Sequence, residues 1–433
     1  MIQEIRIKNF LSFKDEVTFS FEAAKDKFAE DCQVVEVAPG VRLLRLALVY
    51  GANASGKSNL VEAINFLHFF CLRQPKVSNE GTQAIPFLLD NATKNEPSQF
   101  ELVFYVGQTK YAYQLELDAQ QVYVEKLSYY KSVQPTMLFH RVVENGKTTI
   151  SYGSNVKISA LEREKITIEC LRNMSFFAAK ERTNIVLPEI DAAKDWMEDH
   201  FMPMISPKTT MFEYAEKEVA SNPELKTHLL EFLKNADFNI SNVSTKEVKE
   251  QIPEKYMKLF LDNDDIAESE KEKLRKNGSF THFETMFEHV VTNGNEVEKF
   301  SIPREFESLG TLRTFGIETA IFYALQKESV LSIDEFENSL HPKLIKFILL
   351  NYLKTNSKSQ LIVTTHYDPL LNEVSSPNDQ RIFRKDCIWF TEKQENGNTD
   401  LYSLTEFKGL NRLSSIQKAY DFGNFGAVPQ IDF

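Results

Sequence analysis

The chain has 433 residues, 42% of them hydrophobic and 34 of them phenylalanine, which suits two or three domains with buried cores. Its formal net charge of −12 argues against a broad DNA-binding surface, because such surfaces neutralise phosphates, and leaves open only a local basic groove. The widely spaced cysteines form no zinc or disulfide pattern, and no apolar run reaches the roughly 20 residues of a membrane span. We therefore expect a cytoplasmic protein without a membrane partner.

The first third of the chain is predicted to consist of strands around one helix. Alternating apolar and polar side chains predict a pair of strands at the N-terminus, followed by a charged loop at 25–31. A buried strand at 45–50 leads to a helix at 58–70. Further alternation, with turn residues such as Asn145 and Gly146, predicts an antiparallel sheet. The alternating segments are 2–10, 16–23, 99–106, 111–117, 122–130, 136–143 and 148–152.

The pattern changes after residue 155. Residues 156–235 are predicted to be mainly helical, and residues 284–302 to form a hairpin. The charged stretch 246–276 is predicted as solvated helix and loop rather than a nucleic-acid patch, because Glu and Asp balance its Lys. From 303 to 366, helices alternate with buried strands, which implies a mostly parallel sheet with its ligand side at the strand C-termini. The elements are helix 310–326, strand 329–334, a helix opening at His341-Pro342 and strand 360–366.

Residues 51–58, GANASGKS, fit the pattern G-x-x-x-x-G-K-[ST] of a loop that cradles nucleotide phosphates. Its glycines let the backbone N–H groups turn toward the phosphates, Lys57 reaches the β- and γ-phosphates, and Ser58 can ligate Mg²⁺. The strand before the loop and the helix after it would place a helix N-terminus under a phosphate, which disfavours a glycine-rich turn without a ligand. The residues expected to contact the nucleotide are Gly51, Asn53, Ala54, Ser55, Gly56, Lys57, Ser58 and Asn59.

Three further side chains are expected at the same sheet edge. Asp334 and Glu335 end the predicted strand 329–334, where Asp334 would hold Mg²⁺ and Glu335 would orient or deprotonate a water that attacks the γ-phosphate. An Asp-Glu pair after an apolar strand is common, and its pairing with the phosphate loop favours the functional interpretation. His366 ends the neighbouring predicted strand and could hydrogen-bond the γ-phosphate or the water, although a structural histidine is the alternative.

The segment ESLGTLRTFG at 307–316 offers a second helix start that could bind an anion. Ser308, Gly310 and Thr311 supply a hydroxyl group, an uncovered backbone and a positive helix end. Without the other motifs, an ordinary serine-capped helix would be the preferred interpretation.

In this order along the chain, GANASGKS, ESLGT, SVLSIDEFENSLHP and TTH resemble the motifs of ABC-type ATPases of the SMC and RecF class. The chain resembles more closely the bacterial AAA-type ATP-binding proteins related to the ATPase half of OLD nucleases, which are often found in abortive-infection and other phage-defence systems. The resemblance includes the opening IRIKNFLSF and the tail segments IWFTEK, LYSL and YDFGNFGAVPQI. It implies an α/β fold with an ABC-type P-loop ATPase head, built from a mixed sheet and an antiparallel β-subdomain, and a mainly helical insertion.

By this resemblance, ESLGT corresponds to the ABC signature, which contacts the γ-phosphate bound to the other subunit. The implied assembly is a homodimer with ATP and Mg²⁺ between the subunits, and hydrolysis would separate its heads. The signature reads Ser-Leu-Gly-Thr and residues 336–341 lack the usual D-loop Asp; both departures occur in the SMC/RecF-like branch and weaken a transporter interpretation. Gln83 is the candidate for the Q-loop residue. The site would combine Ser308 and Gly310 of one subunit with Lys57, Ser58, Asp334, Glu335 and His366 of the other.

The favoured function is an ATP-hydrolysing switch or sensor in anti-phage defence that acts with a separate effector, such as a nuclease, and with nucleic acid as a further candidate partner. The alternative is a RecF- or SMC-like DNA-repair ATPase that binds DNA. Too few residues follow His366 for a nuclease domain in the same chain. The expected domains are an ATPase lobe at 1–155, a helical insertion at 156–235 and a second lobe at 236–433. Tail residues 423–431 are either a docking segment or a packed end.

Overall fold

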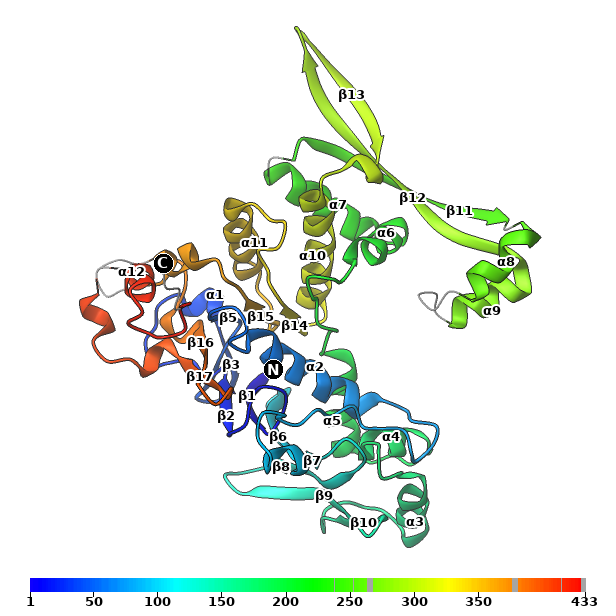
Figure 1. Cartoon of the computed structure of the whole chain (residues 1–433), viewed down its shortest axis with the longest axis vertical. Helices are drawn as coiled ribbons and strands as arrows, with labels where there is room; N and C mark the ends of the chain where they lie inside the picture. Colours follow the sequence, from blue (N-terminus) through cyan, green and yellow to red (C-terminus); the bar gives the residue numbers. More distant parts are fainter. Residues whose placement is uncertain (237, 252, 263–267, 376–380, 414, 430–433) are drawn as a thin grey trace. The chain divides into compact units, whose positions relative to one another are not determined.

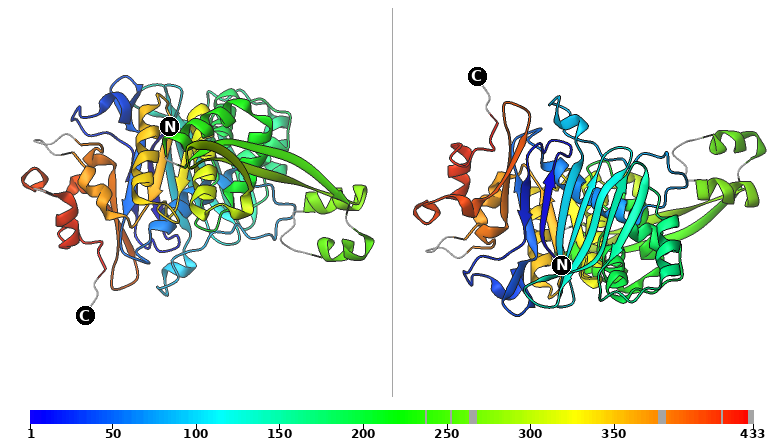
Figure 2. Two further views of the ribbon diagram at one scale, coloured as in Figure 1. Left: turned by 90° about the horizontal axis from the view of Figure 1, so that it is seen from above. Right: turned by 90° about the horizontal axis from the view of Figure 1, so that it is seen from below.

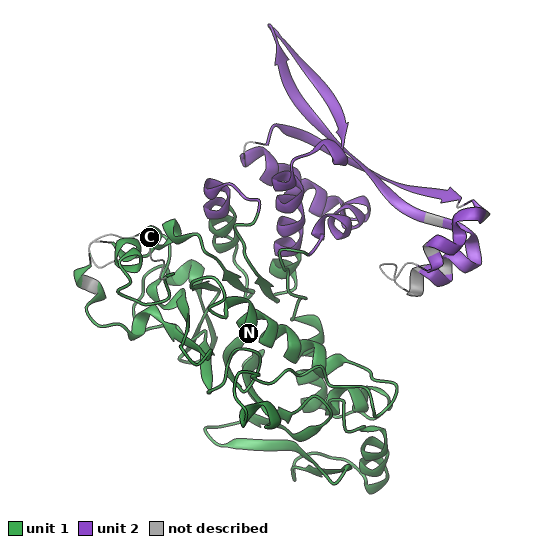
Figure 3. Ribbon diagram, viewed as in Figure 1, with its two compact units in different colours: residues 1–208, 323–338, 348–433 green, residues 209–322, 339–347 purple. Residues whose placement is uncertain are grey.

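A computed structural model of the chain describes residues 1–236, 238–251, 253–262, 268–375, 381–413 and 415–429. The chain forms two compact units (Figure 3). Unit 1 comprises residues 1–208, 323–338 and 348–433, and unit 2 comprises residues 209–322 and 339–347. The segment predicted as a helical insertion contributes helices to both units, and the domain boundaries proposed from the sequence stay a prediction.

The central sheet of unit 1 contains the strand that precedes the phosphate loop. Its order is β14, β15, β5, β16, β17; the first four strands are parallel and β17 is antiparallel (Figure 1). Every residue of β14, β15 and β5 is buried, as in strands covered on both faces. The predicted mostly parallel sheet is confirmed. Its strands are β5 (Leu46–Tyr50), β14 (Val330–Ile333), β15 (Gln360–Thr364), β16 (Ile388–Lys393) and β17 (Thr399–Ser403).

A second sheet of unit 1 is antiparallel, and its cyan strands lie side by side in the right panel of Figure 2. Its order is β10, β9, β8, β7, β6, β1, β2, which confirms the predicted N-terminal strand pair and the hairpin with the GQTK turn. The charged segment 25–31 was predicted as a loop, but its last two residues begin the short helix α1 (Glu30–Gln33). The strands are β1 (Ile2–Lys8), β2 (Val17–Ser20), β6 (Ser98–Val106), β7 (Thr109–Leu117), β8 (Val122–Tyr130), β9 (Pro135–Glu144) and β10 (Lys147–Tyr152); β3 (Val34–Ala38) and β4 (Val41–Leu44) form a separate pair.

Helix α2 (Lys57–Leu72) follows the phosphate loop and joins the two sheets of unit 1. It contacts β15 of the central sheet, and its Phe66 ring lies 5.4 Å from that of Phe100 in β6 and 4.9 Å from that of Phe10. Aromatic side chains of this kind bury much apolar area, so the packing of Phe66 in the middle of α2 fixes the position of the whole helix, including its first turn at the phosphate loop. The helix predicted at 58–70 is confirmed.

A buried ion pair connects the start of α4 (Phe176–Glu181) and the segment before it to the antiparallel sheet. Arg141 of β9 donates to Glu125 of β8 over 2.9 Å, and both side chains are fully buried. Glu125 also accepts the backbone N–H of Phe176, and Arg141 donates to the Leu171 carbonyl, so the pair is satisfied by additional hydrogen bonds. Further helices of unit 1 are α3 (Ala160–Glu169), α5 (Pro188–Asp199) and, near the C-terminus, α12 (Ile416–Asp421).

Unit 2 is built around a long strand, β12, that pairs with β11 along its first part and with β13 along its second (Figure 1). Its core includes the rings of Phe212, Phe287 and Phe315, with centroids 5.5 to 6.1 Å apart. The hairpin predicted at 284–302 is confirmed. The elements are α6 (Met211–Ser221), α7 (Pro223–Asn235), β11 (Ile240–Gln251), α8 (Glu254–Leu261), α9 (Glu268–Asn277), β12 (Ser279–Asn293) and β13 (Glu296–Pro303); α10 (Leu309–Gln326) and α11 (Pro342–Lys354) belong partly to each unit.

The interpretation of the charged stretch 246–276 as helix and loop was wrong for its first six residues. They belong to β11, where Lys246 pairs with Glu284 and Val248 with His282. Most of β11 is solvated, so its charged side chains need no apolar face and the alternation that normally indicates a strand is weak. Helices α8 and α9 agree with the prediction, while residues 252 and 263–267 of this stretch lie outside the described residues.

The tail packs onto unit 1 as far as it is described. Phe425 and Ala427 are buried, and their carbonyls accept the hydroxyls of Tyr402 and Tyr420 over 2.8 and 3.0 Å. These contacts favour the packed end over the docking segment, although residues 430 and 431 lie outside the described residues. Across the described part of the chain, no helix combines the length and apolarity needed to cross a membrane.

Candidate functional site

The loop 51–58 connects β5 to α2, as the sequence predicts, and is tightly curled. Gly56 has a φ of +110°, which favours glycine, and a Cβ there would lie 2.4 Å from Thr399 Oγ1. A Cβ on Gly51 would lie 2.4 Å from Ser55 Oγ. The two glycines are therefore required by close approach, and Ala54 accepts a left-handed φ of +59° between them.

The hairpin of β16 and β17 supports this loop from one side. Thr391 Oγ1 lies 2.6 Å from Ser55 Oγ, and Thr399 Oγ1 lies 2.9 Å from the Ser55 carbonyl oxygen. Thr399 also hydrogen-bonds Ser12 Oγ over 2.8 Å, which connects the loop to the segment after β1. These buried hydroxyls hold the loop in its curled form.

Lys57 is buried at the first turn of α2, and its ammonium faces its own loop. Nζ donates to the carbonyl oxygens of Gly51 and Ala52 over 2.9 and 3.0 Å, and lies 3.4 Å from His366 Nδ1. Burial lowers the pKa of Lys57 from 10.5 to about 8, although nearby carboxylates, with Glu337 the strongest, act in the opposite direction. A phosphate could replace the two carbonyls as the partner of this charge.

Asp334 and Glu335 follow β14, as predicted, but their surroundings differ. Asp334 is buried and accepts a hydrogen bond from Thr364 Oγ1 over 2.5 Å. Glu335 is exposed and has a left-handed φ of +46°, which costs a non-glycine residue about 1 kcal/mol or more. Its N–H donates to Thr364 Oγ1 over 2.9 Å, so one threonine of β15 fixes both acidic residues.

His366 follows β15, the neighbour of both β14 and β5. Its backbone N–H donates to Glu337 Oε1 over 2.6 Å, and this contact positions the imidazole beside Lys57. Burial and then the charge of Lys57 lower the pKa of His366 below its ordinary value, so the ring is neutral at pH 7. Sequence reasoning missed the positioning role of Glu337, for which only its place in the segment after Glu335 offered a signal.

These groups meet in a cavity of about 500 Å³ that belongs to unit 1 alone. The cavity brings residues 53–59 of the phosphate loop together with Glu335 and His366, whereas Asp334 and Gly51 are buried and are not among its lining residues. One lining residue, Lys393, was not predicted, since a single lysine at a strand end has no diagnostic spacing. The lining residues are Asn53, Ala54, Ser55, Gly56, Lys57, Ser58, Asn59, Glu335, His366 and Lys393.

The residues predicted to form the signature lie together at the start of α10, in unit 2. Ser308 is exposed, and its Oγ accepts the Thr311 N–H over 3.0 Å and lies 2.8 Å from Thr311 Oγ1. A Cβ on Gly310 would lie 2.8 Å from the Ser339 carbonyl oxygen, so glycine is needed for this approach. Ser308, Gly310 and Thr311 do not line the cavity of unit 1, and their predicted role requires a second chain.

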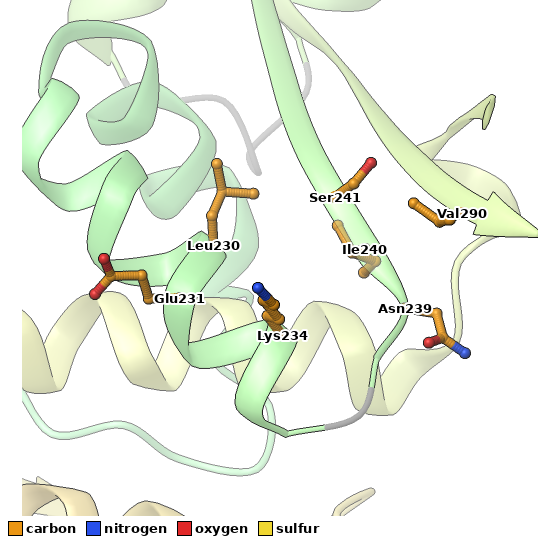
Figure 4. A pocket seen from close by; sticks show the side chains of 7 residues that line it. All are labelled: Leu230, Glu231, Lys234, Asn239, Ile240, Ser241 and Val290. Atoms are coloured by element: carbon orange, nitrogen blue, oxygen red, sulfur yellow. The ribbon is translucent and has the colours of Figure 1, made fainter. Parts of the chain in front are cut away.

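Two further features lie outside this cavity. Gln83, the Q-loop candidate, is exposed with a φ of +71° and is not among the lining residues. Unit 2 has a separate pocket of about 390 Å³, in which side chains of α7 face the start of β11 and one residue of β12 (Figure 4). It contains neither a phosphate loop nor paired carboxylates. Its lining residues are Leu230, Glu231, Lys234, Asn239, Ile240, Ser241 and Val290.

The unit 1 cavity has the groups that a nucleotide with Mg²⁺ requires. The curled loop and the N-terminus of the 16-residue helix α2 supply backbone N–H groups and a positive helix end for phosphates. The described residues include no cluster of three or more His, Cys, Asp or Glu side chains for a metal. Ser58 and Asp334 suit Mg²⁺ because this ion takes one or two protein ligands and completes its shell with phosphates and water.

Comparisons with known proteins give one family match and a set of similar solved structures. A family profile described as "AAA domain, putative AbiEii toxin, Type IV TA system" matches residues 46–142 and 208–372, more than half of the chain. No curated protein matches the chain. Similar solved structures include the SMC head domain from Thermotoga maritima, with a TM-score of 0.38 and 12% identity over 93% of this chain and 98% of that chain.

Two more solved structures share this similarity. The recombination mediator protein RecF with ATP has a TM-score of 0.34 and 15% identity over 93% of this chain and 99% of that chain. An Smc head domain with an extended coiled coil, bound to the C-terminal domain of ScpA derived from Pyrococcus furiosus, has a TM-score of 0.38 and 13% identity over 98% of each chain. The family match confirms the predicted relation to AAA-type proteins of the abortive-infection class. The chain therefore belongs to this AAA domain family and has the α/β fold of a P-loop ATPase.

Proposed function

We propose that this chain binds and hydrolyses ATP with Mg²⁺ and that the bound nucleotide switches it between separate subunits and a homodimer. One observation carries the proposal: Lys57, Glu335 and His366 meet in one cavity at the carboxyl edge of the central sheet, with Asp334 buried beside them. This is where open α/β sheets bind ligands. A phosphate loop alone would support only nucleotide binding.

The residues of the site have different proposed roles, which follow from their surroundings. Lys57 and the loop N–H groups hold the phosphates, and Ser58 with Asp334 holds Mg²⁺. When bound, the ion neutralises charge on the phosphate oxygens. Glu335, exposed to the cavity, orients or deprotonates the attacking water, and the neutral His366 hydrogen-bonds the γ-phosphate or that water.

The surface around Ser308 supports the dimer. Ser308 is exposed, and the apolar side chains beside it, Phe306 and Leu309, are each 76% exposed. Exposed apolar side chains favour contact with a protein partner. The adjacent helix start favours an anion, so we infer that the partner presents a bound phosphate to Ser308. A second copy of the chain has both that phosphate and the complementary residues.

The dimer switch would act in anti-phage defence together with a separate effector. The family description supports this setting, because it names the AbiEii toxin and a Type IV toxin–antitoxin system. The formal charge of −12 gives no support to the alternative, a DNA-repair ATPase.

Replacement of Glu335 by Gln tests the proposed chemistry. The amide cannot accept the proton of the water, so we expect ATP turnover to fall about 100-fold or more while ATP binding persists. The ATP-bound dimer should accumulate and be visible by mass photometry. Glu395→Gln, at an exposed turn, is the matched control and should behave as the unaltered protein. Unchanged turnover in Glu335→Gln would remove Glu335 from the mechanism.

Ser308→Arg tests the second half of the site. Because Ser308 lies outside the cavity of unit 1, we expect unchanged ATP affinity, loss of the ATP-dependent dimer and loss of turnover. Ser301→Arg, at an exposed position of β13, controls for the added charge. A fully active Ser308→Arg protein would contradict the two-subunit site.

A further inference from the structure

Lys393, the last residue of β16, lines the nucleotide cavity without a role in the chemistry described above. Among the described residues its ammonium has no hydrogen-bond or ion-pair partner, whereas Lys57 donates to two carbonyl groups. The cavity therefore has a second positive charge that remains available to a ligand.

The position of Lys393 is fixed relative to the phosphate loop. Side chains two residues apart on a strand point to the same face, so Lys393 lies on the face of β16 from which Thr391 contacts Ser55. The backbone of Lys393 also pairs with Thr399, whose hydroxyl lies 2.9 Å from the Ser55 carbonyl oxygen. Two threonines thus connect the strand that carries this lysine directly to the loop.

The sheet order places Lys393 on a defined side of the loop. β15 and β16 are the two neighbours of β5, which leads into the loop. His366 comes from β15, and Asp334 and Glu335 come from β14 beyond it, so the groups proposed to act on the γ-phosphate all lie on the β15 side. Lys393 is on the other side, away from the attacking water.

We propose that Lys393 is a second cationic contact for the bound nucleotide and neutralises the phosphates that ATP and ADP share. This inference rests on the proposed nucleotide binding at the phosphate loop. It implies that Lys393 contributes to affinity without discriminating between ATP and ADP. An ammonium suits this role because it acts as a point charge without the fixed geometry of a guanidinium.

The test is equilibrium binding of fluorescent ATP and ADP analogues to the full chain. All variants are made in the Glu335→Gln protein, so that ATP is not hydrolysed during the measurement. In this background we expect Lys393→Ala to weaken both nucleotides about fivefold, as for one partly exposed charged contact. Lys393→Arg should retain at least half of the affinity, and Lys393→Glu should weaken both nucleotides further. Lys408→Ala, at an exposed lysine outside the cavity, is the matched control.

The outcomes separate this inference from the proposed function. Equal affinity of Lys393→Ala and the Lys408→Ala control would overturn it, and so would a loss confined to ATP, which would place Lys393 at the γ-phosphate. Lys57→Ala should abolish binding in the same assay. If Lys57→Ala binds normally, the nucleotide site itself is wrong, whatever Lys393 does. Circular dichroism melts of each variant exclude misfolding as the cause of a loss.

Discussion

The charge of Lys57 depends on what occupies the cavity. Burial lowers its pKa to about 8, so the free site is close to losing the proton under mildly basic conditions. A bound phosphate would raise this pKa again, because a nearby negative charge favours the ammonium form. We therefore expect nucleotide binding above pH 8 to be coupled to proton uptake at Lys57.

This coupling predicts the pH dependence of affinity. We expect ADP to bind with full affinity below about pH 8 and progressively more weakly above it, by up to about tenfold per pH unit. Affinity falls with rising pH because Lys57 in the free protein loses its proton above about pH 8 and must regain it when ADP binds. Isothermal titration between pH 7 and 9.5 measures the effect. Lys57→Arg should flatten the profile since the guanidinium stays charged throughout, and an equally steep profile in that variant would exclude Lys57 as the titrating group.

The structure places the predicted loop residues 53–59, Glu335 and His366 around one cavity, while Gly51 and Asp334 do not line it. These residues could be predicted because their motifs have a defined spacing or follow a buried strand. Glu337 and Lys393 were not predicted, because neither belongs to a motif with a diagnostic spacing. Their importance arises from hydrogen bonding to the His366 backbone and from the position of β16 beside β5, which only the folded chain shows.

At the scale of elements, the hairpin of β16 and β17 is a support for the phosphate loop as well as an edge of the sheet. Thr391 and Thr399 contact Ser55 from the two strands. Both threonines are fully buried, so their hydrogen bonds do not compete with solvent. The hairpin therefore couples loop geometry to the stability of unit 1.

Thr399→Val measures this coupling. The substitution preserves shape but removes a hydroxyl from a buried network, so we expect the free energy of unfolding to fall by about 1–3 kcal/mol. ADP affinity should also fall because the loop loses one contact at Ser55. Urea unfolding and ADP titration measure the two effects. Thr149→Val, at an exposed position of β10, should change stability by no more than about 0.5 kcal/mol. Equal behaviour of the two variants would show that the hairpin does not support the loop.

Most elements could be predicted because their burial leaves a pattern in the sequence. The first half of β6 and the second half of β7 alternate in burial, and β5, which is buried throughout, is continuously apolar. The second half of β11, residues 246–251, was found only in the structure, since its mostly solvated side chains leave no hydrophobic period to detect. Its strand conformation comes from pairing with β12, a long-range contact that local sequence does not encode.

At the scale of the whole molecule, one chain carries the two halves of the proposed composite site in different units. The cavity proposed to bind nucleotide belongs to unit 1, and the residues proposed as the signature belong to unit 2 (Figure 3). Binding of nucleotide and its sensing by a second chain can therefore be altered separately by substitution.

Removal of the end of unit 2 that carries α8 and α9 tests this separation. Gln251 and Ser279 are register partners, so an Asn-Gly turn can replace the residues between them. We expect ADP affinity within about twofold of that of the full chain, because every lining residue of the cavity lies in unit 1. Lys57→Ala in the shortened chain should still abolish binding. A large loss of affinity in the shortened chain would mean that the nucleotide site is not confined to unit 1.

The length of β12 allows one strand to connect distant parts of unit 2. It spans 15 residues, about 50 Å of extended chain, and α9 precedes its start. Near its far end, His289 hydrogen-bonds Glu307, the residue before Ser308, and β13 runs back beside it toward the signature. Within unit 2, α9 and the residues predicted to form the signature are therefore joined through one continuous strand and a single side-chain hydrogen bond.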